Sequence, residues 1–230
     1  MPTALITGAS RGLGRAVAHA LAARGWSVVA DARGEQDLAI ALDGLPQAVA
    51  IAGDVTDPAH RARLAAAATQ DGRLDLLVNN ASRLGPSPQP PLLAYPADEL
   101  RHVYETNVVA PLVLTQLLAG PLAAAGGMVI NISSDAAVEH YVGWGGYGSA
   151  KAALDHVSAV LAAEEPGLRW YAFDPGDMRT DMHQQAFPGE DISDRPEPES
   201  VVPALLRLVD ERPPSGRYRA SDLAVAAVTS

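Results

Sequence analysis

The segment ALITGASRGLGRAVAHALAARG, residues 4–25, joins a short apolar run, a glycine-rich turn and a helical pattern in immediate succession. Ala4 to Thr7 predicts a buried strand, and Gly14 to Arg24 predicts a helix. The glycines between them allow a tight turn and a close approach of the backbone to a diphosphate, while the helix N-terminus supplies amide donors and a favourable dipole. The segment therefore predicts a strand, turn and helix that can hold a phosphate.

The same alternation of apolar runs and helical patterns continues along the chain. Further strands are predicted at Ser27 to Ala30, Ala48 to Ala52, Leu74 to Val78, Met128 to Ile132, Arg169 to Phe173 and Gly216 to Arg219. Further helices are predicted at Pro58 to Gln70, Asp98 to Leu122 and Tyr147 to Ala163. Continuous apolar strands between helices are typical of parallel sheets buried on both faces. We expect an α/β fold, with one doubly wound Rossmann domain over residues 1–230 and a mostly seven-stranded parallel sheet flanked by helices.

Two segments break this pattern. Residues 82–96 contain five prolines, and residues 180–200 mix proline and glycine with acidic side chains. Both predict long loops, which in compact domains are either binding walls or plain surface excursions. If the second loop closes as a lid, its acids disfavour a strongly anionic substrate.

The composition excludes several classes of function. The 230 residues include 17 basic and 27 acidic side chains and no cysteine, so the net charge is -10. No nucleic-acid partner is expected for so acidic a chain, and neither a disulfide nor a thiolate metal site is available. The six histidines show no paired spacing such as H-x-x-x-H, so no metal is expected.

The chain also lacks the usual marks of export or membrane insertion. Its N-terminus has no signal-peptide pattern, and its most apolar stretch, Val108 to Ile130, is interrupted by prolines and glycines. We therefore expect a soluble, cytoplasmic protein with no membrane span.

The spacing T-G-x-x-x-G-x-G over Thr7 to Gly14 resembles the short-chain dehydrogenase/reductase family, and the similarity continues to about Thr180. The resemblance implies a cofactor-binding part over about residues 1–130 and a catalytic and substrate part over about 131–230. Gly53-Asp54-Val55 resembles the family's adenine contact, and Asn79-Asn80-Ala81 the end of its fourth strand. The cofactor-binding residues implied here are Gly8, Ser10, Arg11, Gly12, Leu13, Gly14, Asp54, Val55, Asn80 and Ala81. Ser82 replaces the family's usual glycine. A Cβ is penalised at positive φ, so the backbone conformation at this position stays undecided from the sequence.

The end of the second strand bears on which dinucleotide binds. NADP requires cations beside its 2′-phosphate, whereas NAD requires a carboxylate that accepts from its 2′-hydroxyl. Aligned by spacing, Ala32 stands where NAD-selective members carry their acid and Arg33 where NADP-selective members carry a base, with Arg11 as a second cation. NADP(H) is therefore favoured over NAD(H). Asp31 keeps NAD(H) open, because a shift of one residue would place its carboxylate at the selective position; otherwise it faces solvent or caps a turn.

Tyr147-Gly148-Ser149-Ala150-Lys151 opens a predicted helix, and a spacing of four places the phenol and the ammonium on one helix face. A fixed cation nearby favours a phenolate, so we expect Lys151 to lower the pKa of Tyr147. Lys151 is the only lysine in the chain, and a lone lysine placed at random would follow a tyrosine at this spacing about 3% of the time. In the family that this motif resembles, the lysine also holds the nicotinamide ribose.

The resemblance implies further catalytic positions. Ser134 precedes Tyr147 by the family's spacing for the serine that hydrogen-bonds the substrate oxygen, with Ser133 as the competing candidate. Asn107 stands where the family places an asparagine that supports a water linked to the lysine. Pro175, Gly176 and Thr180 match the segment that contacts the nicotinamide.

The sequence thus predicts an NADP(H)-dependent oxidoreductase that moves hydride between nicotinamide and a carbonyl or alcohol, with Tyr147 as general acid and base. Tyr141 and Trp144 would suit an apolar or aromatic substrate, unless they pack in the core or at a subunit contact. Trp170 and Tyr171 stand where the family usually has smaller residues, which suggests an unusual pocket. The resemblance also implies a homodimer or homotetramer.

Three alternatives stay open. The first is a non-catalytic NADP(H)-binding sensor or scaffold on the same fold, which is disfavoured because all four catalytic positions are filled. The second is an NAD-dependent alcohol dehydrogenase, supported by Asp31 alone. The third, a sugar-nucleotide epimerase or dehydratase of the longer related family, is disfavoured by chain length and glycine spacing.

Overall fold

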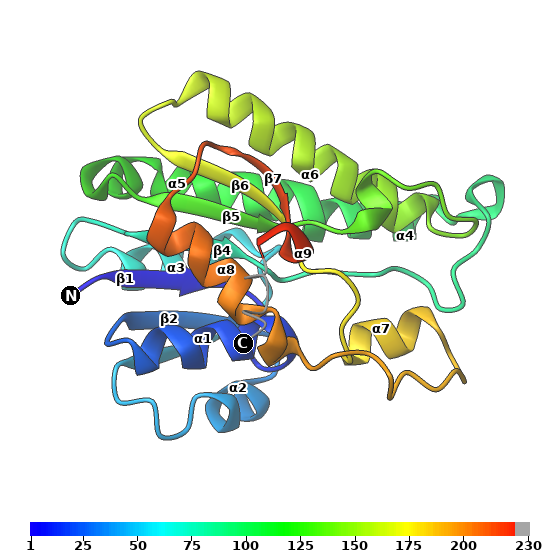
Figure 1. The fold of residues 1–230 in the computed structure, drawn as a ribbon, viewed down its shortest axis with the longest axis horizontal. Coiled ribbons are helices and arrows are strands. Elements are labelled where there is room, and N and C mark those ends of the chain that lie inside the picture. Colours follow the sequence, from blue (N-terminus) through cyan, green and yellow to red (C-terminus); the bar gives the residue numbers. More distant parts are fainter. Residues whose placement is uncertain (224–230) are drawn as a thin grey trace, which may run out of the picture.

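The computed structural model describes residues 1–223 and contains a seven-stranded sheet with helices on both faces (Figure 1). The strands are β1 Thr3–Ile6, β2 Ser27–Ala32, β3 Ala48–Ala52, β4 Leu76–Asn79, β5 Met128–Ile132, β6 Arg169–Asp174 and β7 Gly216–Arg219. Each neighbouring pair is parallel, in the order β3-β2-β1-β4-β5-β6-β7. The predicted fold class and strands are confirmed, with ends that differ by one or two residues.

The order of the strands locates the crevice. The chain moves outward from β1 to β3 and then returns to pair β4 on the other side of β1. In such sheets a ligand binds beyond the carboxyl ends of the strands, at the point where the order reverses. The glycine-rich turn after β1 lies at this point.

The helices differ more from prediction than the strands do. They are α1 Gly12–Ala23, α2 Glu35–Ala41, α3 Pro58–Ala68, α4 Ala97–Tyr104, α5 Ala110–Ala125, α6 Gly145–Glu164, α7 Asp181–Ala186, α8 Val202–Glu211 and α9 Ala220–Leu223. The predicted helix from Asp98 to Leu122 is α4 and α5 joined by a π-helical turn, Glu105–Val109. Helices α2 and α8 were not predicted, and α7 corrects the prediction that residues 180–200 form only a loop.

Two apolar layers hold the helices against the sheet. On one face, α1 and α8 pack on the strands through side chains such as Val17 and Leu205. On the other face, α3 and α5 do so through Leu64 and Leu118. Side chains of α6 complete the second layer, while α7 lies apart from both layers, beyond the strand ends (Figure 1). This separation leaves α7 free to border the crevice.

The stretch Ala97–Ala125 is long and apolar enough to cross a membrane, judged by length and composition alone. In the fold its side chains Leu114, Leu118 and Leu122 are fully buried, in the layer that contains Val129 of β5. We therefore interpret it as a core helix of the domain.

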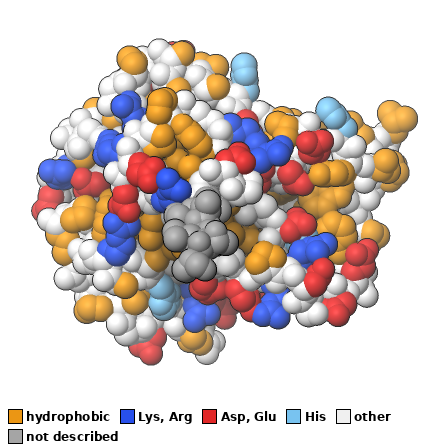
Figure 2. Space-filling view, in the orientation of Figure 1, with side chains coloured by type: hydrophobic (Ala, Val, Ile, Leu, Met, Phe, Trp, Pro, Cys, Tyr) orange, Lys and Arg blue, Asp and Glu red, His pale blue; other side chains and the backbone are white. Residues whose placement is uncertain are grey.

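The surface mixes charge and apolar groups. Figure 2 shows acidic and basic side chains interspersed over one face, and apolar side chains gathered on a projection at the upper right. Figure 1 places the proline-rich 82–96 loop there, and its Leu92 and Leu93 are exposed.

Candidate active site

A cavity of about 1170 Å³ lies beyond the carboxyl ends of the strands. It is lined by the glycine-rich turn of residues 7–14, called the glycine loop below, and by the ends of β2, β5 and β6. The start of α6 and helix α7 complete the lining. Of the predicted site residues, it brings together Gly8, Ser10, Arg11, Gly12, Leu13, Arg33, Asp54, Val55, Asn80, Ala81, Ser134, Tyr147, Lys151, Pro175, Gly176 and Thr180. Gly14 and Asn107 do not line the cavity, but they contact residues that do: Gly14 packs against Gly8 and Asn80, and Asn107 accepts from the Arg83 amide.

Asn80 fixes the glycine loop from the β4 side. Its side-chain amide donates to the carbonyl oxygens of Thr7, at 2.8 Å, and Gly8, at 3.0 Å. In return the Thr7 hydroxyl accepts from the backbone amides of Asn80 and Ala81. A Cβ on Gly14 would lie 2.5 Å from the Asn80 amide nitrogen, so only glycine permits this packing. The loop is therefore preformed.

The start of α1 is suited to an anion. No side chain caps this helix, and its first turn contains no acidic residue. The first amides of a helix lack partners within the helix, so here they are available to a phosphate. Arg11 and Arg33 add two cations to the lining of the cavity. Asp54 is ordered nearby, because its carboxylate accepts from the backbone and hydroxyl of Thr56 at 2.9 and 2.8 Å.

Asp31 agrees with one of the alternatives considered from the sequence, the capping of a turn, because it accepts from the glycine-rich turn that follows β1. It borders the cavity but is 2% exposed, so it does not face solvent. One carboxylate oxygen accepts from the Gly8 amide at 2.8 Å and the other contacts His60 at 3.0 Å. Both oxygens are thus engaged inside the protein, which removes the observation that favoured NAD(H).

Tyr147 and Ser134 meet at the opposite part of the cavity. Burial is the largest influence on the Tyr147 phenol and raises its pKa to about 12, although the hydroxyls of Ser82 and Ser134 act to lower it. The predicted lowering of this pKa is wrong, because desolvation outweighs the two hydroxyls and the charges of Asp135 and Asp174 raise the pKa further. The phenol is therefore protonated at neutral pH and able to donate.

Lys151 lies one turn further along α6, beneath the tyrosine. Its ammonium is 5.5 Å from the Tyr147 ring centroid and donates to the carbonyl of Ile132 at 2.7 Å. Burial lowers the pKa of Lys151 to about 8, and the negative charge of Asp155 partly offsets this. The ammonium is held at the end of β5, beside Ser134.

Ser82 also lines the cavity, a role that the sequence did not indicate. It adopts no positive φ, so the backbone strain considered for a non-glycine residue does not arise. Its hydroxyl donates to the side-chain oxygen of Asn107 at 3.2 Å and also acts on the phenol of Tyr147. Asn107 holds the next residue, because it accepts from the Arg83 amide and donates to the Arg83 carbonyl. The water-supporting role of Asn107 stays a prediction.

Arg217 is a second residue that the sequence did not reveal. From β7 its guanidinium donates to the carboxylates of Asp155 at 3.0 Å and Asp174 at 2.8 Å, and to the backbone carbonyl of Ser134 at 2.9 Å. These groups belong to α6, β6 and the end of β5. The Arg217 side chain therefore joins three segments: α6, which carries Tyr147 and Lys151, the segment of Ser134, and the end of β6, which leads into Pro175 and Gly176. No local motif could have indicated this, since the partners lie 43 to 83 residues away.

Aromatic side chains cluster around Trp144 at one side of the cavity. Trp144 packs edge-to-face on Tyr147, with centroids 5.9 Å apart, and also contacts Tyr141 and Phe187. Trp144 lines the cavity, as do Met182 and Ala186 of α7. Trp170 and Tyr171, in contrast, are buried in the two core layers, which corrects the suggestion that they alter the pocket.

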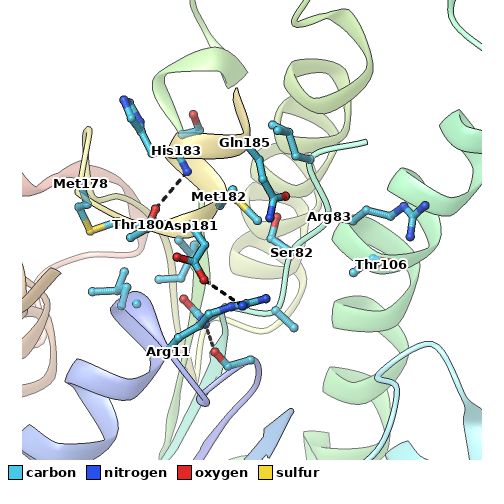
Figure 3. A pocket seen from close by; sticks show the side chains of 18 of the residues that line it. Arg11, Ser82, Arg83, Thr106, Met178, Thr180, Asp181, Met182, His183 and Gln185 are labelled. Carbon is cyan, nitrogen blue, oxygen red and sulfur yellow. Dashed lines mark hydrogen bonds and ion pairs between the residues drawn. The ribbon is translucent and has the colours of Figure 1, made fainter. Parts of the chain in front are cut away.

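Helix α7 closes the site over the glycine loop. The Thr180 hydroxyl caps it by accepting from the His183 amide, and the Asp181 carboxylate pairs with Arg11 at 2.9 Å (Figure 3). Two other acids of this segment pair with arginines, Glu197 with Arg179 and Asp194 with Arg195. These ion pairs weaken the anionic field that the acidic composition of this segment predicted.

Comparison with known proteins agrees with this geometry. A family model described as short chain dehydrogenase matches residues 2–191. Sepiapterin reductase of Mus musculus is 35% identical over 79% of this chain and 76% of that protein, and serine 3-dehydrogenase of Agrobacterium fabrum is 35% identical over 78% and 73%. The structure of a short chain dehydrogenase from Shigella flexneri, complexed with NADP, superposes with a TM-score of 0.88 at 29% identity, covering 96% of this chain and 97% of that one.

The matched residues include the glycine loop, the serine and the tyrosine and lysine pair, and the fold of the solved relative extends beyond them to nearly the whole chain. This chain therefore belongs to the short chain dehydrogenase family of oxidoreductases.

Proposed function

We propose that this protein is an NADP(H)-dependent oxidoreductase that transfers hydride between nicotinamide and a carbonyl or alcohol substrate, with Tyr147 as general acid and base. One observation carries the proposal. A single cavity joins a phosphate-binding loop with two arginines to a part-buried serine, Ser134, and to the buried Tyr147 and Lys151. The loop and the arginines would hold the dinucleotide, and the serine, tyrosine and lysine would act on the carbonyl or alcohol group.

The residues present fit the dinucleotide. The uncapped start of α1 would hold the diphosphate, Asp54 and Val55 would border the adenine, and Lys151 would hold the nicotinamide ribose. Pro175, Gly176 and Thr180 line the part of the cavity expected for the nicotinamide. When bound, the cofactor supplies or accepts the hydride.

The protein's own groups move the proton and stabilise charge. In reduction the Tyr147 hydroxyl donates its proton to the carbonyl oxygen as the carbonyl carbon gains the hydride, and in oxidation the phenolate takes that proton back. Ser134 stabilises the negative charge that develops on the same oxygen. Its hydroxyl donates to the Asp135 carboxylate at 2.9 Å and lies at the cavity with Tyr147.

Charge favours NADP(H) over NAD(H). Arg11 and Arg33 line the cavity, and the only carboxylate at the end of β2 is turned inward. The related Shigella flexneri protein, whose structure contains NADP, supports the same choice. Two exposed cations also hold a 2′-phosphate better than a 2′-hydroxyl.

The apolar side chains of Trp144, Met182 and Ala186, which line the cavity, favour a substrate with an aromatic or extended apolar part. We further propose a homodimer or homotetramer in the cytoplasm. The exposed apolar residues Val109 and Leu117 near and on α5, and Val160 on α6, support association through these helices.

A cofactor titration tests the proposal without knowledge of the substrate. Cofactor fluorescence would be followed while NADPH, and separately NADH, is added to the protein and to Arg33→Ala. We expect NADPH to bind more tightly than NADH, and Arg33→Ala to lose about tenfold in NADPH affinity with little change for NADH. Failure to bind either nucleotide contradicts the proposal.

A panel of aldehydes and ketones then tests catalysis, with Tyr147→Phe as the matched variant. The substitution removes only the phenolic oxygen, so NADPH binding should remain while kcat falls by about 10²–10⁴-fold. Binding without turnover of any carbonyl compound, in wild type as in Tyr147→Phe, would instead indicate a non-catalytic sensor.

A further inference from the structure

Asp31 and His60 form a buried polar pair directly behind the glycine loop. His60 of α3 is 0% exposed and Asp31 of β2 is 2% exposed. The His60 Nε2 atom lies 3.0 Å from the Asp31 Oδ2 atom. Burying such groups costs free energy unless each polar atom has a partner, so a pair kept at this position requires an explanation.

Asp31 contacts two successive amides of the loop. Its Oδ1 atom accepts from the Gly8 amide at 2.8 Å, and its backbone carbonyl accepts from the Ala9 amide at 2.8 Å. The Gly8 carbonyl is held on the other side by Asn80 at 3.0 Å. Gly8 is thus clamped through both its polar atoms, by β4 and by β2.

His60 in turn fixes the Asp31 carboxylate. An arginine side chain can only donate, and Arg63 lies 3.1 Å from the Nδ1 atom of His60. The ring proton is therefore assigned to Nε2, which donates to Asp31. Because both ring nitrogens are engaged, Arg63 and Asp31 fix the orientation of the ring.

The local chain is shaped to admit this ring. Gly53, at the end of β3, is so close that a Cβ there would lie 2.2 Å from the Nδ1 atom of His60. A side chain at position 53 would displace the ring from Asp31. Gly53, His60 and Asp31 therefore form a continuous support from α3 to the glycine loop.

We infer that Asp31 and His60 are positioning residues that hold the glycine loop for the diphosphate, and that Asp31 does not select between NADP and NAD. The inference rests on the proposed role of the loop in binding a nicotinamide dinucleotide. It adds that Asp31 acts on the diphosphate, which both cofactors share, and not on the ribose, at which the two cofactors differ.

The two roles predict different affinity changes for Asp31→Ala, measured by fluorescence titration with NADPH and with NADH. A positioning residue acts on the shared diphosphate, so both dissociation constants should rise by a similar factor, about tenfold, and their ratio should stay constant. Loss of NADH binding alone would show that Asp31 contacts the ribose. Unchanged or tighter binding of both would show that the contact with Gly8 does not position the loop.

Further variants separate positioning from a general loss of structure. Asp31→Asn keeps an acceptor for Gly8 and should recover part of the affinity. His60→Ala should weaken both cofactors less than Asp31→Ala does, and the double variant should be no weaker than Asp31→Ala, because His60 acts through Asp31. Asp43→Ala removes an exposed acid that does not line the cavity and should bind as wild type does.

Steady-state kinetics with a carbonyl substrate provides a second readout, in which the cofactor KM should rise more than kcat falls. If Asp31→Ala does not fold, Asp31→Asn and His60→Ala carry the same comparison of NADPH with NADH. Equal binding in these variants and wild type overturns the inference. If wild type itself binds neither nucleotide, the proposed function fails, so the two failures are distinguishable.

Discussion

The glycine loop and α7 face each other across the cavity, yet they are held in different ways. The loop is fixed by hydrogen bonds from part-buried and buried groups, among them Asn80 and Asp31. Helix α7 and the chain that follows it are held by ion pairs between exposed side chains, such as Arg11 with Asp181, and by apolar contacts of partly buried side chains such as Met182. Exposed pairs contribute about 0–1 kcal/mol each and are screened by salt, whereas a buried polar group left without its partner costs about 1–3 kcal/mol.

The difference indicates which wall is preformed. The cofactor wall cannot shift without leaving buried groups unpaired, so it is ready before the cofactor binds. The α7 wall can exchange its ion pairs for water at little cost and is free to adjust to a substrate. The catalytic groups belong to the first kind of region, because Arg217 ties their segments together from β7.

The largest effect should come from breaking that tie. Arg217→Met removes the cation that bridges Asp155 and Asp174 and leaves Asp174 only the longer contact with Arg219 at 3.9 Å, so we expect the free energy of unfolding to fall by about 3 kcal/mol. Urea unfolding would measure the loss. Arg207→Met is the matched control, since Arg207 pairs with Glu211 on the surface of α8 and its removal should cost less than about 1 kcal/mol. Equal losses in the two variants would contradict the comparison.

The second effect concerns pH. Because burial lowers the pKa of Lys151 to about 8, the unfolded chain binds more protons than the native protein between about pH 8 and its ordinary value of 10.5. Stability contributed by this group therefore rises with pH across that window.

From pH 7 to 10, wild type should gain about 2 kcal/mol of unfolding free energy relative to Lys151→Met. Urea unfolding of both proteins at several pH values measures this. The raised pKa of Tyr147 makes stability fall with pH only above about pH 10, so it does not oppose the effect of Lys151 between pH 7 and 10. Parallel pH profiles for the two proteins would show that Lys151 is not desolvated.

A smaller effect is expected from Ser82. Its hydroxyl acts to lower the pKa of Tyr147, so Ser82→Gly should move the rise of alcohol oxidation with pH to higher pH and reduce kcat by about threefold. Ser82→Thr keeps the hydroxyl and should retain the wild-type profile. An unchanged profile in Ser82→Gly would mean that the hydroxyl only supports Asn107.

The smallest effect should come from the α7 wall. Asp181→Asn frees Arg11 for the cofactor, so NADPH affinity should increase by up to about threefold at low salt, and the difference should vanish at high salt. Fluorescence titration at two salt concentrations measures it. A loss of affinity larger than threefold would place Asp181 among the fixed contacts of the loop.

The sequence by itself determined the strands, their parallel sheet and the placement of tyrosine and lysine on one helix face. Each of these depends on local rules, namely continuous apolar runs, glycines at a turn and a spacing of four in a helix. The short helix α7 has only six residues, which carry little periodic signal, whereas the ten residues of α8 carry an apolar pattern that local rules can detect.

Only the tertiary structure decided how the polar groups are used. Asp31 turns inward because α3 places His60 behind it, and Arg217 reaches its partners across three segments. The direction of the Tyr147 pKa shift likewise depends on burial, which outweighs the hydroxyls of Ser82 and Ser134 that act to lower this pKa. Burial and contacts between distant residues are properties of the packed chain, so no local pattern contains them.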